Sequence, residues 1–238
     1  MTGKLVISVD CSTSAAKAVV WDESGKAIAE GRKGFDVHQP KSGWGEQDAR
    51  DWWDAVTTAI AEATAKSLAP ELIAAISITH QRETFVCLDK QDQPIRPAIL
   101  WLDVRATEEV DEYGTADVHR ITGKPVNPTP AWYKLLWLAK YEPSTMERLH
   151  RVVDVAGFII HCLTGEWATS WASADPLGVL DLSTFDYDDG LLTTAGLSRD
   201  SLPRLAKPGD IVGQLTDTVA DHLGLPRGLP VAAAAGDG

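Results

Sequence analysis

Three apolar runs lie in the stretch LVISVDCSTSAAKAVVWDESGKAIAE, residues 5–30. The first ends at Asp10, the second covers residues 18–21 and the third covers residues 27–30. Residues 22–26, between the second and third runs, have the polar and glycine composition of a hairpin turn. Turns this short join antiparallel neighbours. The stretch therefore predicts an antiparallel meander of three strands at the start of the chain.

The rest of the chain mixes helical spacing with short apolar runs. Apolar residues recur at helical spacing within residues 48–66, where Asp48 or Asp51 can serve as the N-cap. The same criteria predict helices over 105–113, 132–139, 152–163, 190–195 and 216–223, and strands over 73–78, 85–88, 99–101 and 229–234. Strands followed by alternating helices and strands indicate the α/β class.

Composition and charge exclude several classes of protein. The 238 residues are 44% apolar, which argues against disorder over most of the chain, and their number predicts one or two domains. Lys and Arg total 22 against 34 Asp and Glu, a net charge of −12, which argues against a partner that is nucleic acid or an anionic membrane. A phosphate held by backbone amides stays compatible with this charge. No apolar run approaches the roughly 18 residues of a transmembrane helix.

The cysteines and histidines indicate neither a disulfide framework nor a metal centre. Cys11, Cys87 and Cys162 are odd in number and far apart, so reduced thiols are expected. None of the six histidines pairs with another histidine or a cysteine at ligand spacing. The N-terminus has no signal-peptide pattern. We therefore expect a soluble cytoplasmic protein.

The turn after the first strand is a candidate phosphate site. Asp10-Cys11-Ser12-Thr13-Ser14, with Lys17 following, offers backbone amides and hydroxyl donors between two strands. Asp10, at a strand end, is suited to a hydrated Mg²⁺. The alternative is an ordinary polar turn. Walker, dinucleotide-binding, zincin and hydrolase-elbow motifs are absent from the sequence.

Two further segments carry the polar and aromatic residues that suit a polyol. His80-Gln81-Arg82-Glu83, between two predicted strands, combines donors with acceptors, which sugar hydroxyls require. Trp101-Leu102-Asp103-Val104-Arg105 places an aromatic ring beside an acid and a base. The alternatives are a solvated turn for the first segment, and a core tryptophan with Asp103 as a helix cap for the second. Trp44, in a glycine-flanked polar stretch, is the tryptophan that packing explains least.

An aspartate between two glycines ends the sequence. Asp237, in Gly236-Asp237-Gly238, follows a strand of small residues, so the predicted site has room for a ligand beside its carboxylate. Such a carboxylate can accept the proton of a hydroxyl that attacks phosphorus. The alternative is a frayed terminus.

In this order, these segments resemble the N-terminal domain of the FGGY family of carbohydrate kinases, over essentially the whole chain. Asp10-Cys11-Ser12-Thr13-Ser14 resembles the family's first phosphate motif, Trp44 to Trp53 its W-x-E-Q-x-x-x-x-W-W stretch, and Gln81-Arg82-Glu83 the Gln-Arg-Glu of glycerol kinases. Trp101 to Arg105 resembles the family's Trp-x-Asp-x-Arg segment, and Asp237 falls where the family has its catalytic aspartate. Each motif is weak alone; together and in order they are specific.

The resemblance implies a fold, an activity and roles. The fold would be an actin-like, ribonuclease-H-like domain with a mixed sheet, an antiparallel three-stranded start and flanking helices. The reaction would be transfer of the ATP γ-phosphoryl group to a hydroxyl of a sugar or polyol, with Mg²⁺, in a protein that is often a homodimer. The implied residues are Asp237 as general base; Arg82, Glu83 and Trp101, with Asp103 as a weaker candidate, for the substrate; Thr13, Ser14 and Lys17 for the nucleotide phosphates; and Asp10 for Mg²⁺.

Three residues depart from the family pattern. Ser12 replaces a glycine, Lys17 stands where arginine is common, and Thr129 stands where glycerol kinases place a tyrosine near the substrate. The smaller Thr129 suggests a larger acceptor than glycerol, such as a ketopentose or a longer polyol.

The second, nucleotide-binding domain of the family has no counterpart in residues 1–238, which we interpret as the N-terminal, sugar-binding domain. Because phosphoryl transfer needs both partners positioned and water excluded, residues 1–238 alone are expected to be inactive. Two rival hypotheses stay open: a non-catalytic actin-fold sugar-binding or regulatory module, and an actin-like ATPase or assembly protein.

Overall fold

The predicted N-terminal meander is present in the computed structural model, which describes residues 3–236. β1 (Leu5–Cys11), β2 (Ala15–Trp21) and β3 (Ala27–Gly34) pair antiparallel. β5 (Ile73–His80) adds parallel to β1, β14 (Pro230–Ala233) adds parallel to β5, and β13 (Ile211–Gln214) closes the edge antiparallel to β14. The result is a sheet of order β13-β14-β5-β1-β2-β3. It is mixed and has an antiparallel three-stranded start, as expected.

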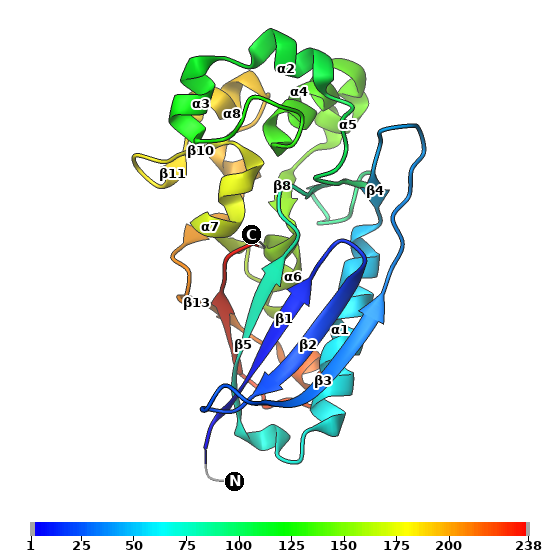
Figure 1. Ribbon diagram of the computed structural model, residues 1–238, viewed down its shortest axis with the longest axis vertical. Helices are drawn as coiled ribbons and strands as arrows, with labels where there is room; N and C mark the ends of the chain where they lie inside the picture. Colours follow the sequence, from blue (N-terminus) through cyan, green and yellow to red (C-terminus); the bar gives the residue numbers. More distant parts are fainter. Residues whose placement is uncertain (1–2, 237–238) are drawn as a thin grey trace.

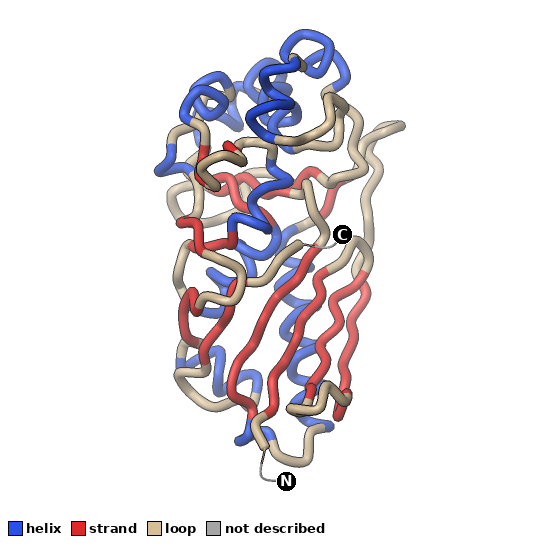
Figure 2. Tube along the Cα trace, turned by 60° about the vertical axis from the view of Figure 1, so that its left-hand side comes forward, coloured by secondary structure: helices blue, strands red, loops and turns tan. Residues whose placement is uncertain are grey.

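Helices cover one face of this sheet. α1 (Ala49–Lys66) crosses behind β1, β2 and β3, and it begins where the Asp48 side chain accepts a hydrogen bond from the Arg50 amide (Figure 1). α6 (Val155–Thr164) and α9 (Asp217–Leu223) complete the layer. The alternate residues of β1 that point toward α1, Leu5, Ile7 and Val9, are fully buried. Figure 2 shows the strands of the sheet side by side along the lower half of the molecule.

Gly31 is where β3 approaches α1 most closely. A Cβ atom at this position would overlap the Ala59 carbonyl oxygen and lie 2.8 Å from Cβ of Glu62. We expect Gly31→Ala to lower the free energy of unfolding by about 1–3 kcal/mol, because the backbone of α1 would have to move. Urea unfolding measures this change. Gly34→Ala in the same strand is the matched control, since its Cβ would meet only the Ser14 carbonyl oxygen at 3.6 Å, and equal losses in both variants would contradict the packing argument.

A second core lies above the first and is mostly helical (Figures 1 and 2). Its small sheet has the order β4-β7-β6-β8. The strands are β4 (Glu46–Gln47), β6 (Phe85–Leu88), β7 (Ala98–Ile99) and β8 (Arg151–Asp154). The helices are α2 (Thr107–Tyr113), α3 (Ala116–Thr122), α4 (Ala131–Tyr141), α5 (Pro143–Arg148) and α8 (Asp189–Thr194).

The remaining elements are shorter. They are β9 (Ala168–Ser170), α7 (Trp171–Ala174), β10 (Leu180–Asp181), β11 (Asp186–Tyr187), β12 (Arg204–Ala206) and three 3₁₀ turns at 70–72, 175–177 and 199–201. Among residues 3–236, no helix is both long and apolar enough to cross a membrane.

The predicted helix over 152–163 is wrong at its start. Val152 lies in β8, and the helix begins at Val155, capped by the Asp154 side chain, which accepts a hydrogen bond from the Gly157 amide at 2.9 Å. Val152 pairs with Cys87 of β6. The apolar period runs on across the boundary because both elements are buried, so the pattern alone could not separate them.

Candidate functional site

The predicted polar segments meet at one edge of the large sheet. β1, β5 and β14 are parallel, so Cys11, His80 and Ala233 end these strands at the same edge. Ligands bind at this carboxyl edge in many open α/β sheets. The turns beyond β1 and β5 therefore bring residues 12–14 and 81–83 together, although almost seventy positions separate them.

A pocket of about 280 Å³ lies at this edge. It is lined by Thr13, Gln81, Arg82, Glu83 and Trp101. Trp101 is 42% exposed, and its indole Nε1 donates to Thr13 Oγ1 at 3.0 Å, which fixes the ring over the pocket. Three predicted substrate residues, Arg82, Glu83 and Trp101, are thus brought together, with the predicted phosphate residue Thr13 beside them.

Glu83 is held in an unusual state within the pocket. Its φ of 54° lies in the left-handed region, which is uncommon for a residue with a side chain and recurs at functional sites. Burial raises the pKa of its carboxyl group above the usual value, with Arg82 and Lys124 opposing the shift. A strained, partly desolvated carboxyl group beside Arg82 is suited to accepting hydrogen bonds from a ligand.

A buried glutamine ties the walls of the pocket together. Gln47 is fully buried; its Nε2 donates to the Thr13 carbonyl oxygen at 2.6 Å, and its Oε1 accepts from Trp52 Nε1 at 2.9 Å and Gln81 Nε2 at 3.0 Å. Thr84 continues the chain of hydrogen bonds: its Oγ1 donates to Gln81 Oε1 at 3.3 Å and accepts from the Trp101 amide at 3.0 Å. The stretch from Trp44 to Trp53 therefore supports the pocket from behind.

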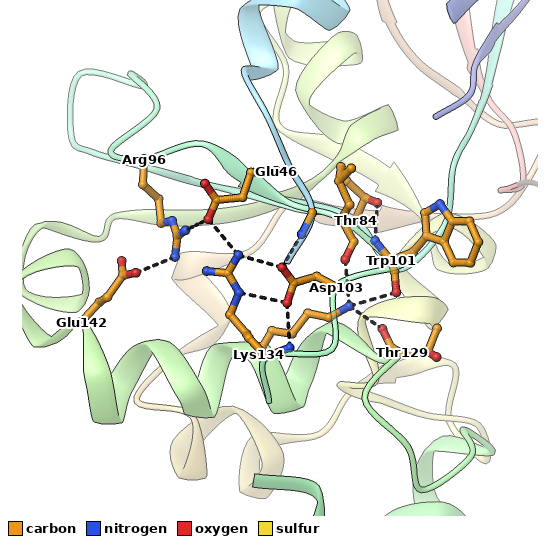
Figure 3. Close-up of polar contacts among 11 residues, drawn as sticks. Glu46, Thr84, Arg96, Trp101, Asp103, Thr129, Lys134 and Glu142 are labelled. Atoms are coloured by element: carbon orange, nitrogen blue, oxygen red, sulfur yellow. Dashed lines mark hydrogen bonds and ion pairs between the residues drawn. The ribbon is translucent and has the colours of Figure 1, made fainter. Parts of the chain in front are cut away.

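Beneath this layer lies a buried ion cluster (Figure 3). Arg105 donates to both oxygens of Asp103, from Nε at 2.9 Å and Nη2 at 2.7 Å, and also from Nη2 to Glu46 Oε1 at 2.7 Å. Its guanidinium lies 3.7 Å from the centre of the Trp44 ring. This cation–π contact explains Trp44, whose role the sequence left open. Arg96 pairs with the same oxygen of Glu46, Oε1.

Asp103, the weaker candidate for the substrate, does not line the pocket. Its side chain is fully buried, and besides Arg105 it accepts hydrogen bonds from the backbone amides of Gly45 at 2.7 Å and Arg105 at 2.9 Å. With both oxygens engaged inside the protein, it has no surface for a ligand. Asp103 instead holds the Trp44–Gln47 segment against the Trp101 loop.

Lys134, at the centre of Figure 3, is a fully buried lysine that links two walls of the site. Its ammonium Nζ donates to the carbonyl oxygens of Thr129 at 2.8 Å, Leu100 at 3.0 Å and Trp101 at 3.4 Å. Burial lowers the pKa of Lys134 to about 7, against opposing attraction from Asp103 and Glu83. Thr129 is connected to the site by the hydrogen bond from this ammonium to its carbonyl oxygen. Its side chain is outside the lining of the 280 Å³ pocket.

The low pKa of Lys134 predicts a pH dependence of stability. The folded state releases the proton near pH 7 and the unfolded state near pH 10.5, so the unfolded state binds more protons between these values. The free energy of unfolding should therefore rise with pH above 7, by up to about 1.4 kcal/mol per unit for one proton, relative to Lys134→Met. Urea unfolding at pH 6 to 9 measures the difference. Lys33→Met, at an exposed position, is the control, and a parallel pH profile for wild type and Lys134→Met would contradict the prediction.

The other predicted phosphate and metal residues lie farther along the same edge. Asp10 accepts a hydrogen bond from Ser12 Oγ at 3.3 Å, and Ser14 is exposed. Lys17 pairs with Glu30 at 2.9 Å across the exposed face of β2 and β3 and is outside the lining of the pocket. Among residues 3–236, no three His, Cys, Asp or Glu side chains are grouped to hold a metal ion. A hydrated Mg²⁺ does not require such a group, because it is usually held by one or two carboxylates plus substrate phosphates.

Asp237 lies outside the described residues, but the segment leading to it is fixed at the pocket. The Ala234 carbonyl oxygen accepts hydrogen bonds from Ser170 Oγ and from Ser173 Oγ, the latter at 3.3 Å, and the Ala235 carbonyl oxygen accepts from Thr79 Oγ1 at 2.8 Å. Gly236 lies so close to Arg82 that a Cβ would come within 2.6 Å of Arg82 Cγ. Only glycine allows this approach of the chain to Arg82.

Four of the residues that build the site were missed in the sequence. They are Gln47, Thr84, Lys124 and Lys134, all at least partly buried. A lysine within the otherwise apolar face of the 131–141 helix was the one available signal, because a buried ammonium needs acceptors. The partners that give the other three their place in the site include Thr13, Trp101 and Asp175, which are distant in sequence.

Comparisons with known proteins agree on one protein family. Residues 5–238 match the profile of the FGGY family of carbohydrate kinases, N-terminal domain. The chain is 34% identical over 244 residues to the xylulose kinase of Streptomyces coelicolor, covering 99% of this chain and 49% of that protein. It is 32% identical over 242 residues to the glycerol kinase of Thermococcus gammatolerans, covering 98% and 48%.

Solved structures agree with the sequence comparison. The gluconate kinase of Lactobacillus acidophilus superposes with a TM-score of 0.95 at 30% identity, over 100% of this chain and 49% of that chain. The ligand-bound xylulose kinase of the same organism gives a TM-score of 0.94 at 30% identity, over 99% and 48%. The chain thus spans about half the length of the relatives that it matches, and the resemblance found in its motifs is confirmed.

Proposed function

Because the chain belongs to the FGGY family of carbohydrate kinases, we propose that it forms the N-terminal, acceptor-binding lobe of an ATP-dependent kinase. The reaction is transfer of the ATP γ-phosphoryl group to a hydroxyl of a sugar or polyol. The pocket of Thr13, Gln81, Arg82, Glu83 and Trp101 carries this proposal, since it places donors, an acceptor and an aromatic ring around one small space.

The pocket residues are suited to holding a polyol. Arg82 only donates hydrogen bonds and Glu83, when ionised, only accepts them, so a hydroxyl can be engaged from both sides. Trp101 offers an apolar ring for the C–H face of the acceptor. We assign Asp237 as the general base that takes the proton of the attacking hydroxyl, because residues 234–236 are fixed beside Arg82.

The nucleotide would approach from the β1–β2 turn. Thr13 and Ser14 can donate hydroxyl and amide hydrogen bonds to phosphate. Lys17 would have to break its ion pair with Glu30 to bind the phosphate. Asp10, beside this turn, would hold a hydrated Mg²⁺, which would neutralise charge on the phosphates. A single carboxylate at a strand end fits this way of binding Mg²⁺.

The proposal also covers the second lobe, the cellular location and the oligomeric state. Relatives are about twice as long, so a second lobe would supply most of the nucleotide site, and residues 1–238 alone should not turn over. A cytoplasmic location agrees with the use of ATP and with three unpaired cysteines. Burial raises the pKa of the Cys11 and Cys87 thiols, which keeps them protonated. We include a homodimer in the proposal, which sedimentation velocity can test.

An acceptor panel tests the proposed function. The longest natural chain that contains this sequence is incubated with ATP, Mg²⁺ and xylulose, glycerol or gluconate, and acceptor-dependent release of ADP is measured. We expect release with at least one acceptor. Binding of an acceptor without turnover would instead favour a non-catalytic sugar-binding module. ATP hydrolysis with polymer formation and no acceptor dependence would favour an actin-like assembly protein.

A further inference from the structure

A second cavity adjoins the pocket on the far side of Arg82. Its volume is about 320 Å³, and its walls include Arg82, Lys124, Asp175, Trp171 and Phe185. Arg82 lines both spaces, and Gly236 lines the second. A ligand that fills the pocket near Glu83 can therefore extend past Arg82 into the second cavity without leaving the site.

The polar wall of this cavity offers both a donor and an acceptor. Asp175 Oδ2 accepts from Lys124 Nζ and, at 3.4 Å, from Arg82 Nη2. Asp175 Oδ1 and Arg82 Nε are buried and have no hydrogen-bond partner among the described residues. Both side chains are largely buried, so unmet hydrogen bonds there are costly.

This combination favours hydroxyl groups over a carboxylate. A hydroxyl can donate to Asp175 Oδ1 and accept from Arg82 or Lys124. A carboxylate can only accept, and it would meet the negative charge of Asp175 at close range. The unmet acceptor Asp175 Oδ1 thus favours a polyhydroxy ligand, whose hydroxyls can donate to it.

The opposite wall is apolar. The Trp171 and Phe185 rings lie 5.0 Å apart, and the Leu182 side chain continues the wall. Phe185 and Leu182 are exposed, and Phe185 has a left-handed φ of 54°. The exposed Phe185 ring and the half-buried Trp171 ring suit the C–H face of a carbohydrate chain. The backbone strain at Phe185 is of the kind found at ligand sites.

We propose that the cavity of Lys124, Asp175, Trp171 and Phe185 is a subsite for the remote hydroxyls of a neutral sugar or alditol of five or six carbons. This inference rests on the proposed kinase function and narrows its acceptor. A three-carbon acceptor fills the pocket at Glu83 and leaves the subsite unused. A longer chain satisfies Asp175 Oδ1 and Arg82 Nε, so the enzyme prefers it.

The test compares acceptors of different length and charge. The longest natural chain carrying this sequence is assayed with xylitol, glycerol and gluconate, as wild type and as Asp175→Asn and Lys124→Met. We expect wild type to have its highest kcat/KM with xylitol. In each variant the xylitol-to-glycerol ratio of kcat/KM should fall about tenfold to a hundredfold, mainly through KM, as loss of a hydrogen bond to a charged group predicts. Asp175→Asn should also raise the relative kcat/KM with gluconate.

Matched controls separate binding from folding. Asp117→Asn and Lys140→Met change the same residue types at exposed positions outside the lining of the cavity, and both should keep the wild-type ratio. An unchanged ratio in Asp175→Asn and Lys124→Met, or a wild-type preference for glycerol or gluconate, would overturn the subsite while leaving the kinase function in place.

Tryptophan fluorescence provides a readout that needs no turnover. Titration with xylitol should quench the emission of wild type, and Trp171→Phe should lose much of that change. If no acceptor is phosphorylated, the proposed function fails, and the titration still decides the subsite. Absence of any xylitol-dependent change in wild type would then overturn the subsite as well.

Discussion

Asp237→Asn is expected to lower kcat for acceptor phosphorylation by about 10²–10⁴-fold, the usual contribution of a general base. Asparagine keeps the size of the side chain but cannot take the proton from the attacking hydroxyl. Gly236 permits close contact with Arg82, and the carbonyl groups of Ala234 and Ala235 are held by hydrogen bonds, so the backbone before the substitution should stay in place. Initial rates across acceptor concentrations, in the longest natural chain, give kcat and KM separately.

The acceptor KM should change far less than kcat in this variant. Arg82, Glu83 and Trp101, which we assign to acceptor binding, are intact in it. Asp117→Asn, at an exposed position, is the control for loss of a carboxylate in general and should retain wild-type rates. A kcat for Asp237→Asn within about threefold of wild type would refute the assignment of this aspartate as the base.

Asp103→Ala is expected to lower the free energy of unfolding by about 3–5 kcal/mol, as removal of one partner of a buried ion pair does. The Arg105 side chain is fully buried and would keep Glu46 alone as its counterion. The Gly45 amide would also lose its acceptor at 2.7 Å. Arg105 Nε and the Gly45 amide would then be buried donors without their acceptor, which accounts for the size of the effect.

Chemical unfolding of Asp103→Ala beside Asp117→Ala tests the buried role. Asp117 pairs with Arg120 on the surface, so its loss should cost less than about 1 kcal/mol. Asp103→Ala as stable as wild type, but with a raised acceptor KM, would support the prediction that Asp103 binds substrate. A large loss of stability would support its role beneath the Trp101 loop.

Local pattern was sufficient where one element buries one regular face. The meander predicted over residues 5–30 and the helix predicted within residues 48–66 follow from apolar runs, turn composition and helical spacing, and both are confirmed. Pattern failed at Val152, where a buried strand passes directly into a buried helix. It also missed β12 and β13, strands of three and four residues that depend on partners elsewhere in the chain.

Some residues of the site could likewise be predicted from the sequence, and others could not. The pocket residues Arg82, Glu83, Trp101 and Thr13 could be proposed from sequence because motifs keep them recognisable, and the structure brings them together. The burial of Asp103 against Arg105 was not foreseen, because a sequence does not show whether a carboxylate next to an aromatic residue points outward or toward a buried arginine. Gln47 and Lys134 were missed because their partners, such as Thr13 and Thr129, are distant in sequence or contribute backbone oxygens.

By itself the sequence determined the α/β class, the antiparallel start of the sheet, the acidic surface charge and the family resemblance. These properties depend on periodicity, composition and short motifs, which are local. Only the tertiary structure decided which polar groups are buried and with what partners: Asp103 against Arg105, Lys134 against three carbonyl oxygens, and Asp175 between Lys124 and Arg82. The physical reason is that desolvation and hydrogen bonding depend on distances between residues far apart in the chain, and folding alone sets those distances.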